Sequence, residues 1–245
     1  MSALSTMSCN SKFLSSIRLL QSSPQPCIYK PGEHATSVFL DPYITITKRM
    51  SSKLSELGYR RSGAHLYRPD CQFCHACISC RIPVAQFRLS RSYKRVLSRN
   101  NDLTMVEQSN LADDNSYALY SKYISERHGD GDMFPATMEE FESFIKTRMV
   151  NTRFHLFYEQ GNLVMVSVID ELDQGVSAVY TFYDTDLNNR SLGKYAILRQ
   201  INYCQSRGLP YLFLGYWIRG CARMHYKISF RPIELLLDDE WIVIN

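Results

Sequence analysis

The chain has 245 residues, 45% hydrophobic and 21% charged, a composition typical of folded globular proteins. Its length allows one large core or two small ones, and no apolar run is long enough for a membrane span, so we expect no transmembrane helix. Four of the eight cysteines crowd into one short segment, which argues against a disulfide scaffold and favours a reducing, cytoplasmic setting.

The N-terminal third of the chain divides into a lead-in and a cysteine-rich part. Residues 1–23 are rich in serine and lack the continuous apolar segment of a signal peptide, so we expect a flexible lead-in. Apolar residues at helical spacing predict a helix over residues 43–57, ended by Gly58. We then expect a strand over residues 82–87 and a short basic helix that Ser90 or Ser92 caps.

A loop after Pro69 carries four cysteines at a uniform two-residue spacing: Cys71, Cys74, Cys77 and Cys80. Repeated C-x-x-C spacing lets a short loop direct several thiolates to one point, as a soft metal or an iron–sulfur cluster requires. The last gap is shorter than in bacterial ferredoxins, and zinc modules usually separate their ligand pairs. The pattern therefore indicates a ligand loop without identifying its metal; the alternative is reduced thiols that act as small apolar residues.

Positive charge is concentrated around this loop. The segment from Arg60 to Arg99 holds nine basic residues and one acid, Asp70, so its net charge is +8 in a chain of net +4. A segregated positive field is typical of proteins that bind nucleic acid, because each neutralised phosphate releases counterions. The alternative is a solvated basic face.

From residue 109 the pattern changes to helices and antiparallel strands. We expect a helix around residues 119–127, a second that begins with the capping box Thr137-x-x-Glu140, and a three-stranded meander within 154–183. A helix over residues 191–207, a strand and a C-terminal hairpin follow. The predicted fold is α+β: a cysteine-rich, basic α/β domain at residues 24–108 and an acyltransferase domain with a mainly antiparallel sheet at residues 109–245.

The order of these elements resembles that of the acetyltransferase (GNAT) superfamily. In that superfamily a glycine-rich turn at a helix N-terminus holds the pyrophosphate of coenzyme A. The corresponding turn here, Ser191-Leu192-Gly193-Lys194, has a single glycine, so we do not expect coenzyme A as a donor. A phosphate or ribose remains compatible with this turn.

The residues also resemble one particular family, the bacterial aspartate/glutamate leucyltransferases, which are relatives of the eukaryotic arginyl-tRNA–protein transferases. The matching segments run in order through almost the whole chain: Cys27-x-Tyr29-x-Pro31-Gly32, Leu57 to Gly63, Tyr67-Arg68-Pro69-x-Cys71-x-x-Cys74-x-Ala76-Cys77, Pro83-Val84-x-x-Phe87, Ser90 to Asn100, Arg127-His128, Phe182-Tyr183-Asp184, Ser191-Leu192-Gly193 and Gly215 to Lys227.

This resemblance implies an enzyme of the N-degron (N-end rule) pathway. It would transfer leucine from leucyl-tRNA to the N-terminal amine of proteins that begin with Asp or Glu, with arginyl-tRNA as the alternative donor. The family's metal site would correspond to Cys27, Cys71, Cys74 and Cys77, holding an iron–sulfur cluster or zinc. Cys80 departs from the bacterial pattern and is kept as a reserve ligand.

Aminolysis of the tRNA ester requires a group that takes a proton from the α-amine and donors that stabilise the oxyanion. No covalent intermediate is needed, because the ester is already activated. The predicted site has three parts. The catalytic candidates are Asp184, Tyr226 and His128. The substrate-binding candidates are Arg81, Arg127, Lys227, Tyr183, Tyr216 and Trp217. The tRNA-binding candidates are Arg91, Lys94, Arg95, Arg99, Ser191 and Lys194.

Two other classes of function compete with this interpretation. A non-catalytic redox sensor that binds RNA would explain the cysteines and the basic segment, but not the acyltransferase-like second half. An N-acyltransferase that uses coenzyme A would keep the fold but needs the glycine-rich turn that is missing. The sequence does not decide the oligomeric state.

Overall fold

The computed structural model describes residues 13–15, 17–111, 114–131, 133–149 and 151–245. Its N-terminal part contains a four-stranded antiparallel sheet in the order β1-β4-β6-β5 and a small β2–β3 ribbon. These strands are β1 (Leu19–Gln21), β2 (Gln25–Pro26), β3 (His34–Ala35), β4 (Ser37–Leu40), β5 (Arg60–Ser62) and β6 (His65–Pro69). Of the predicted lead-in, residues 1–12 lie outside the described residues, whereas residues 19–21 pair with β4.

The larger sheet has eight strands in the order β14-β13-β7-β12-β11-β10-β9-β8. Only β11 and β12 pair in parallel; the other neighbours are antiparallel, which confirms the mainly antiparallel sheet. The strands are β7 (Cys77–Pro83), β8 (Thr104–Gln108), β9 (Thr152–Glu159), β10 (Asn162–Glu171), β11 (Gly175–Tyr183), β12 (Tyr211–Ile218), β13 (Ile233–Leu237) and β14 (Glu240–Ile244).

The two parts share this sheet. Residues 77–108 were expected in the N-terminal domain, but β7 lies between β13 and β12, and β8 forms the far edge beside β9. The sequence does not indicate this arrangement, because nothing in the strand Cys77–Pro83 identifies its distant partner, Tyr211–Ile218. The last strand of the cysteine loop is therefore an internal strand of the larger sheet.

The helices begin where the sequence places capping residues. Thr47 accepts a hydrogen bond from the Met50 amide, Ser90 from the Tyr93 amide, and Thr137 forms the predicted capping box with Glu140. The helical segments are α2 (Lys48–Glu56), α3 (Arg91–Arg99), α4 (Asp114–Arg127), α5 (Met138–Glu140), η1 (Phe141–Lys146), η2 (Thr185–Arg190), α6 (Leu192–Ser206) and η3 (Ala222–Ser229).

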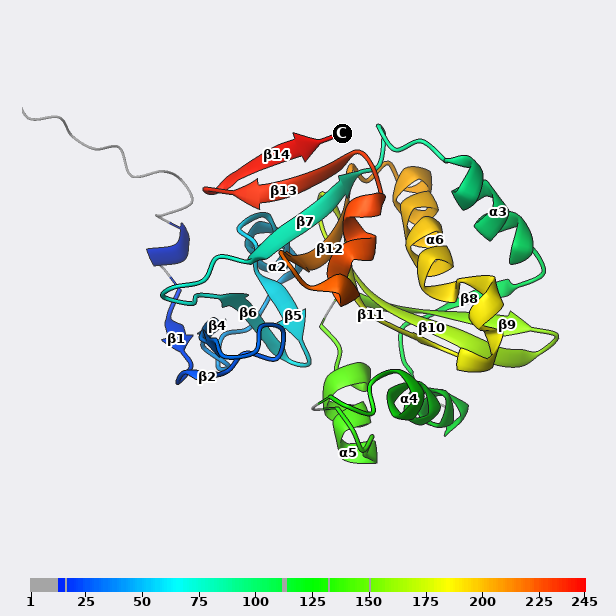
Figure 1. Cartoon of the computed structure of the whole chain (residues 1–245), viewed down its shortest axis with the longest axis horizontal. Helices are drawn as coiled ribbons and strands as arrows, with labels where there is room; N and C mark the ends of the chain where they lie inside the picture. Colours follow the sequence, from blue (N-terminus) through cyan, green and yellow to red (C-terminus); the bar gives the residue numbers. More distant parts are fainter. Residues whose placement is uncertain (1–12, 16, 112–113, 132, 150) are drawn as a thin grey trace, which may run out of the picture.

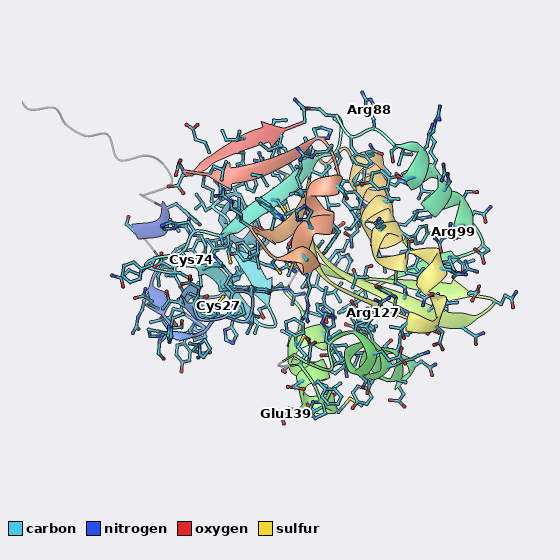
Figure 2. All side chains as sticks on the ribbon, in the orientation of Figure 1. Cys27, Cys74, Arg88, Arg99, Arg127 and Glu139 are labelled. Carbon is cyan, nitrogen blue, oxygen red and sulfur yellow. The ribbon has the colours of Figure 1, made fainter. Side chains whose placement is uncertain are left out.

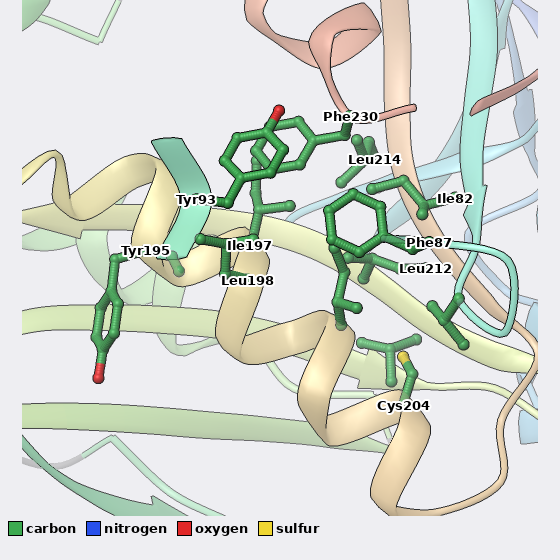
Figure 3. Close-up of a cluster of buried hydrophobic side chains, with 14 of the residues drawn as sticks. Ile82, Phe87, Tyr93, Tyr195, Ile197, Leu198, Cys204, Leu212, Leu214 and Phe230 are labelled. Carbon is green, nitrogen blue, oxygen red and sulfur yellow. The ribbon is translucent and has the colours of Figure 1, made fainter. Parts of the chain in front are cut away.

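Helices cover both faces of the larger sheet (Figure 1). On one face α6 and α3 bury a core that includes Leu198, Leu212 and Phe230, and Tyr93 stacks on Phe230 with ring centroids 4.9 Å apart (Figure 3). On the other face α4 and η1 bury a second aromatic cluster around Phe182. Alternate residues of each strand serve opposite faces, as the pleat requires.

A buried ion pair joins the N-terminal sheet to the larger one. The Arg61 guanidinium of β5 donates to Asp170 of β10 at 2.7 Å, and the two side chains are only 1% and 5% exposed. Arg61 also donates to the carbonyls of Gly63 and Thr147, while Thr152 donates to the other Asp170 oxygen at 2.6 Å. Both charges are thus paired and hydrogen-bonded, which is the condition for burying them at tolerable cost.

Breaking this pair should destabilise the fold strongly. We expect Arg61→Met to lower the free energy of unfolding by about 3–5 kcal/mol, because it leaves a buried carboxylate without its cation. The double variant Arg61→Met/Asp170→Leu removes both charges, and its free energy of unfolding should fall less than that of the single variant. Urea unfolding measures both values, and Lys146→Met, at a solvent-exposed ion pair, is the control. Equal losses in the Arg61 and Lys146 variants would contradict this role.

Candidate active site at the separated strands

The larger sheet opens between its two parallel strands. β11 and β12 pair only over Gly175–Ser177 and Tyr211–Phe213, and their later residues have no common register. β12 also has an irregularity between Phe213 and Gly215 where it pairs with β7. The C-terminal ends of the two strands, at Tyr183 and Ile218, therefore flank an opening in the sheet.

Arg60 of β5 reaches into this opening. Its guanidinium donates to the carbonyl of Val179 on β11 at 2.7 Å and to that of Leu214 on β12 at 3.0 Å. A Cβ atom at Gly215 would lie 1.5 Å from the Arg60 Nη1, and Gly215 has a φ of +72°. Only glycine thus satisfies both the backbone conformation and the close approach. The sequence analysis did not select Arg60, although it is one of two consecutive arginines.

Lys227 of η3 is the second cation at the opening. Its side chain is buried, and its ammonium group donates to the carbonyl of Tyr216 at 2.6 Å. Burial, together with the charge of Arg60, lowers the pKa of Lys227 to about 7, while Cys80 opposes this shift. Lys227 was predicted to bind substrate, and the structure places it beside Arg60.

Tyrosine hydroxyls surround the two cations. The hydroxyl of Tyr216 donates to the carbonyls of Gly58 and Tyr67, and the rings of Tyr67 and Tyr216 meet edge to face at 5.9 Å. Burial raises the pKa of Tyr29 to about 12 and also raises that of Tyr226, although the Tyr226 side chain still reaches solvent. These phenols stay un-ionised and can donate hydrogen bonds at neutral pH.

The end of α4 forms the opposite wall. Tyr123 contacts Tyr183 at 4.9 Å and His128 at 5.3 Å between ring centroids. Burial lowers the pKa of His128, and nearby Arg223 lowers it further while Asp130 opposes this effect. His128 is therefore a neutral imidazole at pH 7, able to accept a proton. Arg127, at the last position of α4, is exposed (Figure 2).

Asp184 is more constrained than the sequence indicated. Its carboxylate accepts from Lys122 at 2.7 Å and from the Asp186 amide at 3.1 Å, so it also caps η2. The same lysine contacts Asp186. Asp184 follows Tyr183 directly, at the mouth of the opening, but its charge is already shared with Lys122.

Three predicted site residues have structural roles instead. Arg81 is buried and ion-paired to Glu234 at 2.5 Å and Glu56 at 2.7 Å, with Tyr211 and Trp241 against its guanidinium, so it has no free face for a substrate. Trp217 packs against the main core. Cys80 lies in that core, where its thiol donates to the Gly215 carbonyl; burial raises its pKa to about 11.

The other loop cysteines lie near Cys221, which was not among the predicted metal ligands. Cys74, Cys77 and Cys221 pack against the same small cluster around Tyr216. Burial raises the pKa of the Cys77 thiol to about 11, and the neighbouring thiols of Cys27, Cys71, Cys74 and Cys221 add to this rise. Figure 2 shows Cys27 and Cys74 in the same region. Among the described residues, no three His, Cys, Asp or Glu side chains have the arrangement of a metal site.

The predicted tRNA-binding helix leads towards the opening. Arg91, Lys94 and Arg95 of α3 are exposed, while Arg99 donates to the carbonyl of Asn189 and Asn100 to that of Arg190 at 2.9 Å. The C-terminal end of α3 thus contacts η2, next to Ser191 and Lys194 at the start of α6. The other end of α3 borders a cavity of about 330 Å³ that is lined by Arg88, Lys94, Ile201 and neighbouring residues.

Comparisons with known proteins agree with this arrangement. Residues 25–95 match the profile described as "Arginine-tRNA-protein transferase, N terminus", and residues 115–237 match its C-terminal counterpart. Proteins called aspartate/glutamate leucyltransferase are 44% identical in Teredinibacter turnerae, over 95% of this chain and 96% of that protein, and 46% identical in Pseudomonas fluorescens SBW25, over 95% and 99%.

Solved structures give only a distant likeness. The structure of L-PGS from Bacillus licheniformis aligns with a TM-score of 0.45 at 9% identity, covering 68% of this chain and 49% of that one. Within the described residues, no helix combines the length and apolar character needed to cross a bilayer.

The family and sequence matches define an enzyme of the transferase class, which acts on an aminoacyl-tRNA and a protein. The chain belongs to the arginine-tRNA-protein transferase family.

The buried position of Lys227 predicts a specific pH dependence of stability. Its pKa is about 7 in the folded protein and close to 10.4 when unfolded, so the unfolded state binds more protons between these values. Stability from this residue should therefore rise with pH from 7 to 10. We expect the melting temperature of the Lys227→Met variant, relative to the wild type, to fall across this range.

The matched control is Lys194→Met, which removes an exposed lysine. Its melting temperature, compared with that of the wild type, should change little with pH. A constant difference between the Lys227 variant and the wild type from pH 6 to 10 would show that Lys227 titrates normally in the folded protein.

Proposed function

We propose that the chain transfers leucine from leucyl-tRNA to the N-terminal α-amine of proteins that begin with Asp or Glu. The observation that carries this proposal is the identity of 44% or more, over 95% of the chain, to proteins named for that activity. The opening between β11 and β12 supports it, because it presents two cations and several neutral hydroxyls at one place.

The reaction is aminolysis of an ester. The α-amine attacks the carbonyl carbon of the aminoacyl group, a C–N bond forms, and the ester C–O bond breaks to release the ribose hydroxyl of the tRNA. An α-amine has a pKa of about 7.7–8.0, so most of it must lose a proton before it attacks. The neutral imidazole of His128 is suited to take this proton.

The remaining residues are suited to binding and orientation. Tyr226, whose pKa is raised, is a hydrogen-bond donor near the mouth of the opening, and Tyr183 lies there against Tyr123; both hydroxyls are suited to stabilise the oxyanion or hold the ribose. The Asp184 carboxylate is already ion-paired with Lys122. We therefore assign it to orienting the α-ammonium group of the acceptor before that group loses its proton. Arg127 is exposed at the edge and is suited to contact either substrate.

Leucyl-tRNA would lie along α3 with its acceptor end directed to the N-terminus of α6. The basic side chains on α3 are exposed and thus accessible to phosphates, and the hydrogen bonds from Arg99 and Asn100 hold the helix against η2. Ser191 and Lys194, at the start of α6, are suited to contact the terminal nucleotide. The contact between the C-terminal end of α3 and η2 supports this direction.

Neutralising two exposed residues of α3 tests this assignment. We expect Arg91→Gln with Arg95→Gln to weaken tRNA binding and to reduce the slope of log K against log salt by about 1–2, because two fewer phosphates are neutralised. Filter binding at several salt concentrations measures the slope. An unchanged slope would remove α3 from the tRNA site.

The thiols of Cys27, Cys71, Cys74 and Cys77 are proposed to hold zinc or an iron–sulfur cluster. Soft thiolates in a shared, partly exposed region suit either group chemically. Such a group would supply rigidity to this region, and the transfer reaction itself does not require it. Metal analysis of anaerobically purified protein tests the proposal: Cys74→Ser should lose metal, whereas the core variant Cys80→Ser should retain it.

A transfer assay tests the central proposal. Purified protein is incubated with radiolabelled leucyl-tRNA or arginyl-tRNA and with peptides that begin with Asp, Glu or Ala. We expect leucine on the acidic peptides alone. Arginine on these peptides, which the family's description makes the second candidate, would keep the reaction and change the donor. No transfer from either tRNA would overturn the proposal.

A further inference from the structure

Arg60, which is partly buried, and Lys227, which is buried, differ from the buried arginines Arg61 and Arg81. Arg61 is paired with Asp170, and Arg81 with Glu56 and Glu234. In the part of the chain that the structure describes, neither Arg60 nor Lys227 lies within 4.0 Å of a carboxylate.

Removing an unpaired cation from water raises the free energy of the folded protein. Charged side chains are rarely removed from water unless an anion compensates them. Here three backbone carbonyls, of Val179, Leu214 and Tyr216, accept from the two cations, but carbonyl dipoles do not neutralise the charge. The opening therefore carries positive charge that a bound anion would neutralise.

The guanidinium of Arg60 is also held rigidly. Its two terminal nitrogens are hydrogen-bonded to different strands, so its plane is fixed between β11 and β12. A guanidinium has five N–H donors, and these two bonds leave others for a ligand. A preformed planar donor suits a carboxylate, which can accept two parallel hydrogen bonds.

We propose that Arg60, with Lys227 beside it, binds the side-chain carboxylate of the acceptor protein's N-terminal residue and so determines the preference for Asp and Glu. This inference rests on the proposed function, since it names the group that selects the acceptor in that reaction. The carboxylate would enter between β11 and β12, and the adjoining α-amine would remain near Tyr226. The Tyr226 hydroxyl is close enough to Arg60 to interact with its charge.

A tRNA phosphate fits this position less well than a carboxylate. A phosphate within the tRNA backbone has a nucleoside on each side, whereas the Arg60 guanidinium is held between β11 and β12 by their carbonyls. The exposed cations of α3 offer phosphates a more accessible surface. A terminal carboxylate on a short side chain needs only a narrow entrance.

The test compares acidic acceptors with their neutral isosteres. Peptides that begin with Asp, Asn, Glu and Gln are assayed with the wild type and with Arg60→Met. We expect the variant to lose roughly 10- to 100-fold in kcat/KM for the Asp and Glu peptides, the range for a lost charge-assisted hydrogen bond, and to change little for Asn and Gln. The Asp-to-Asn preference should largely disappear.

The matched control is Arg219→Met, which removes an exposed arginine from the connection between β12 and η3. It should retain the wild-type preference. Because Arg60 joins two strands, its removal could unfold the site, so Arg60→Lys is tested in parallel. We expect Arg60→Lys to restore part of the preference for acidic peptides, with melting temperature and tRNA binding measured for each variant.

Two results would overturn this inference. An Asp-to-Asn preference that is unchanged in folded Arg60→Met would show that another group binds the carboxylate. Equal losses for acidic and neutral peptides, with weaker binding of leucyl-tRNA, would assign Arg60 to a phosphate instead. Failure of the wild type to transfer leucine to any peptide would count against the proposed function, and it is distinguishable from both.

Discussion

Two consecutive arginines of a three-residue strand set the position of every other part of the site. Neighbouring residues of a strand point to opposite sides, so Arg60 and Arg61 leave β5 in different directions. Arg61 reaches Asp170 on β10, and Arg60 reaches the carbonyls of β11 and β12. The N-terminal sheet is thereby attached to three strands of the larger one. Because the attachment uses the strands that border the opening, the geometry of the site depends directly on how the two sheets meet.

The cysteine-rich region and the opening are connected through the same segments. Cys221 packs near Cys77, and the chain then continues into η3, which carries Tyr226 and Lys227. Tyr216 contributes a side chain to the cluster at the cysteines and a carbonyl to Lys227. A change in the thiols would therefore be transmitted over a short distance to Tyr226 and Lys227.

Local features of the sequence predicted local structure well. Short-range hydrogen bonding predicted the helix caps at Ser90 and Thr137, and these caps are confirmed. Apolar runs separated by turns predicted the antiparallel meander, which is also confirmed. Long-range pairing could not be predicted. Arg81 resembled a substrate-binding residue because its partner Glu234 lies 153 positions away. Arg60 was missed for the same reason, since only the fold shows that no carboxylate of the described residues pairs with it and that Gly215 makes room for it.

The position of β7 has a consequence for how this protein can evolve. Its backbone is paired with β12 on one side and with β13 on the other, although β7 precedes both by more than a hundred residues. A C-terminal fragment that began at residue 109 would lack β7 and β8, and it would expose the edges of β9, β12 and β13 and the apolar surface that Ile78 and Ile82 cover, which invites aggregation. The N-terminal and C-terminal regions must therefore be inherited, made and folded together, and neither can be exchanged as a separate module.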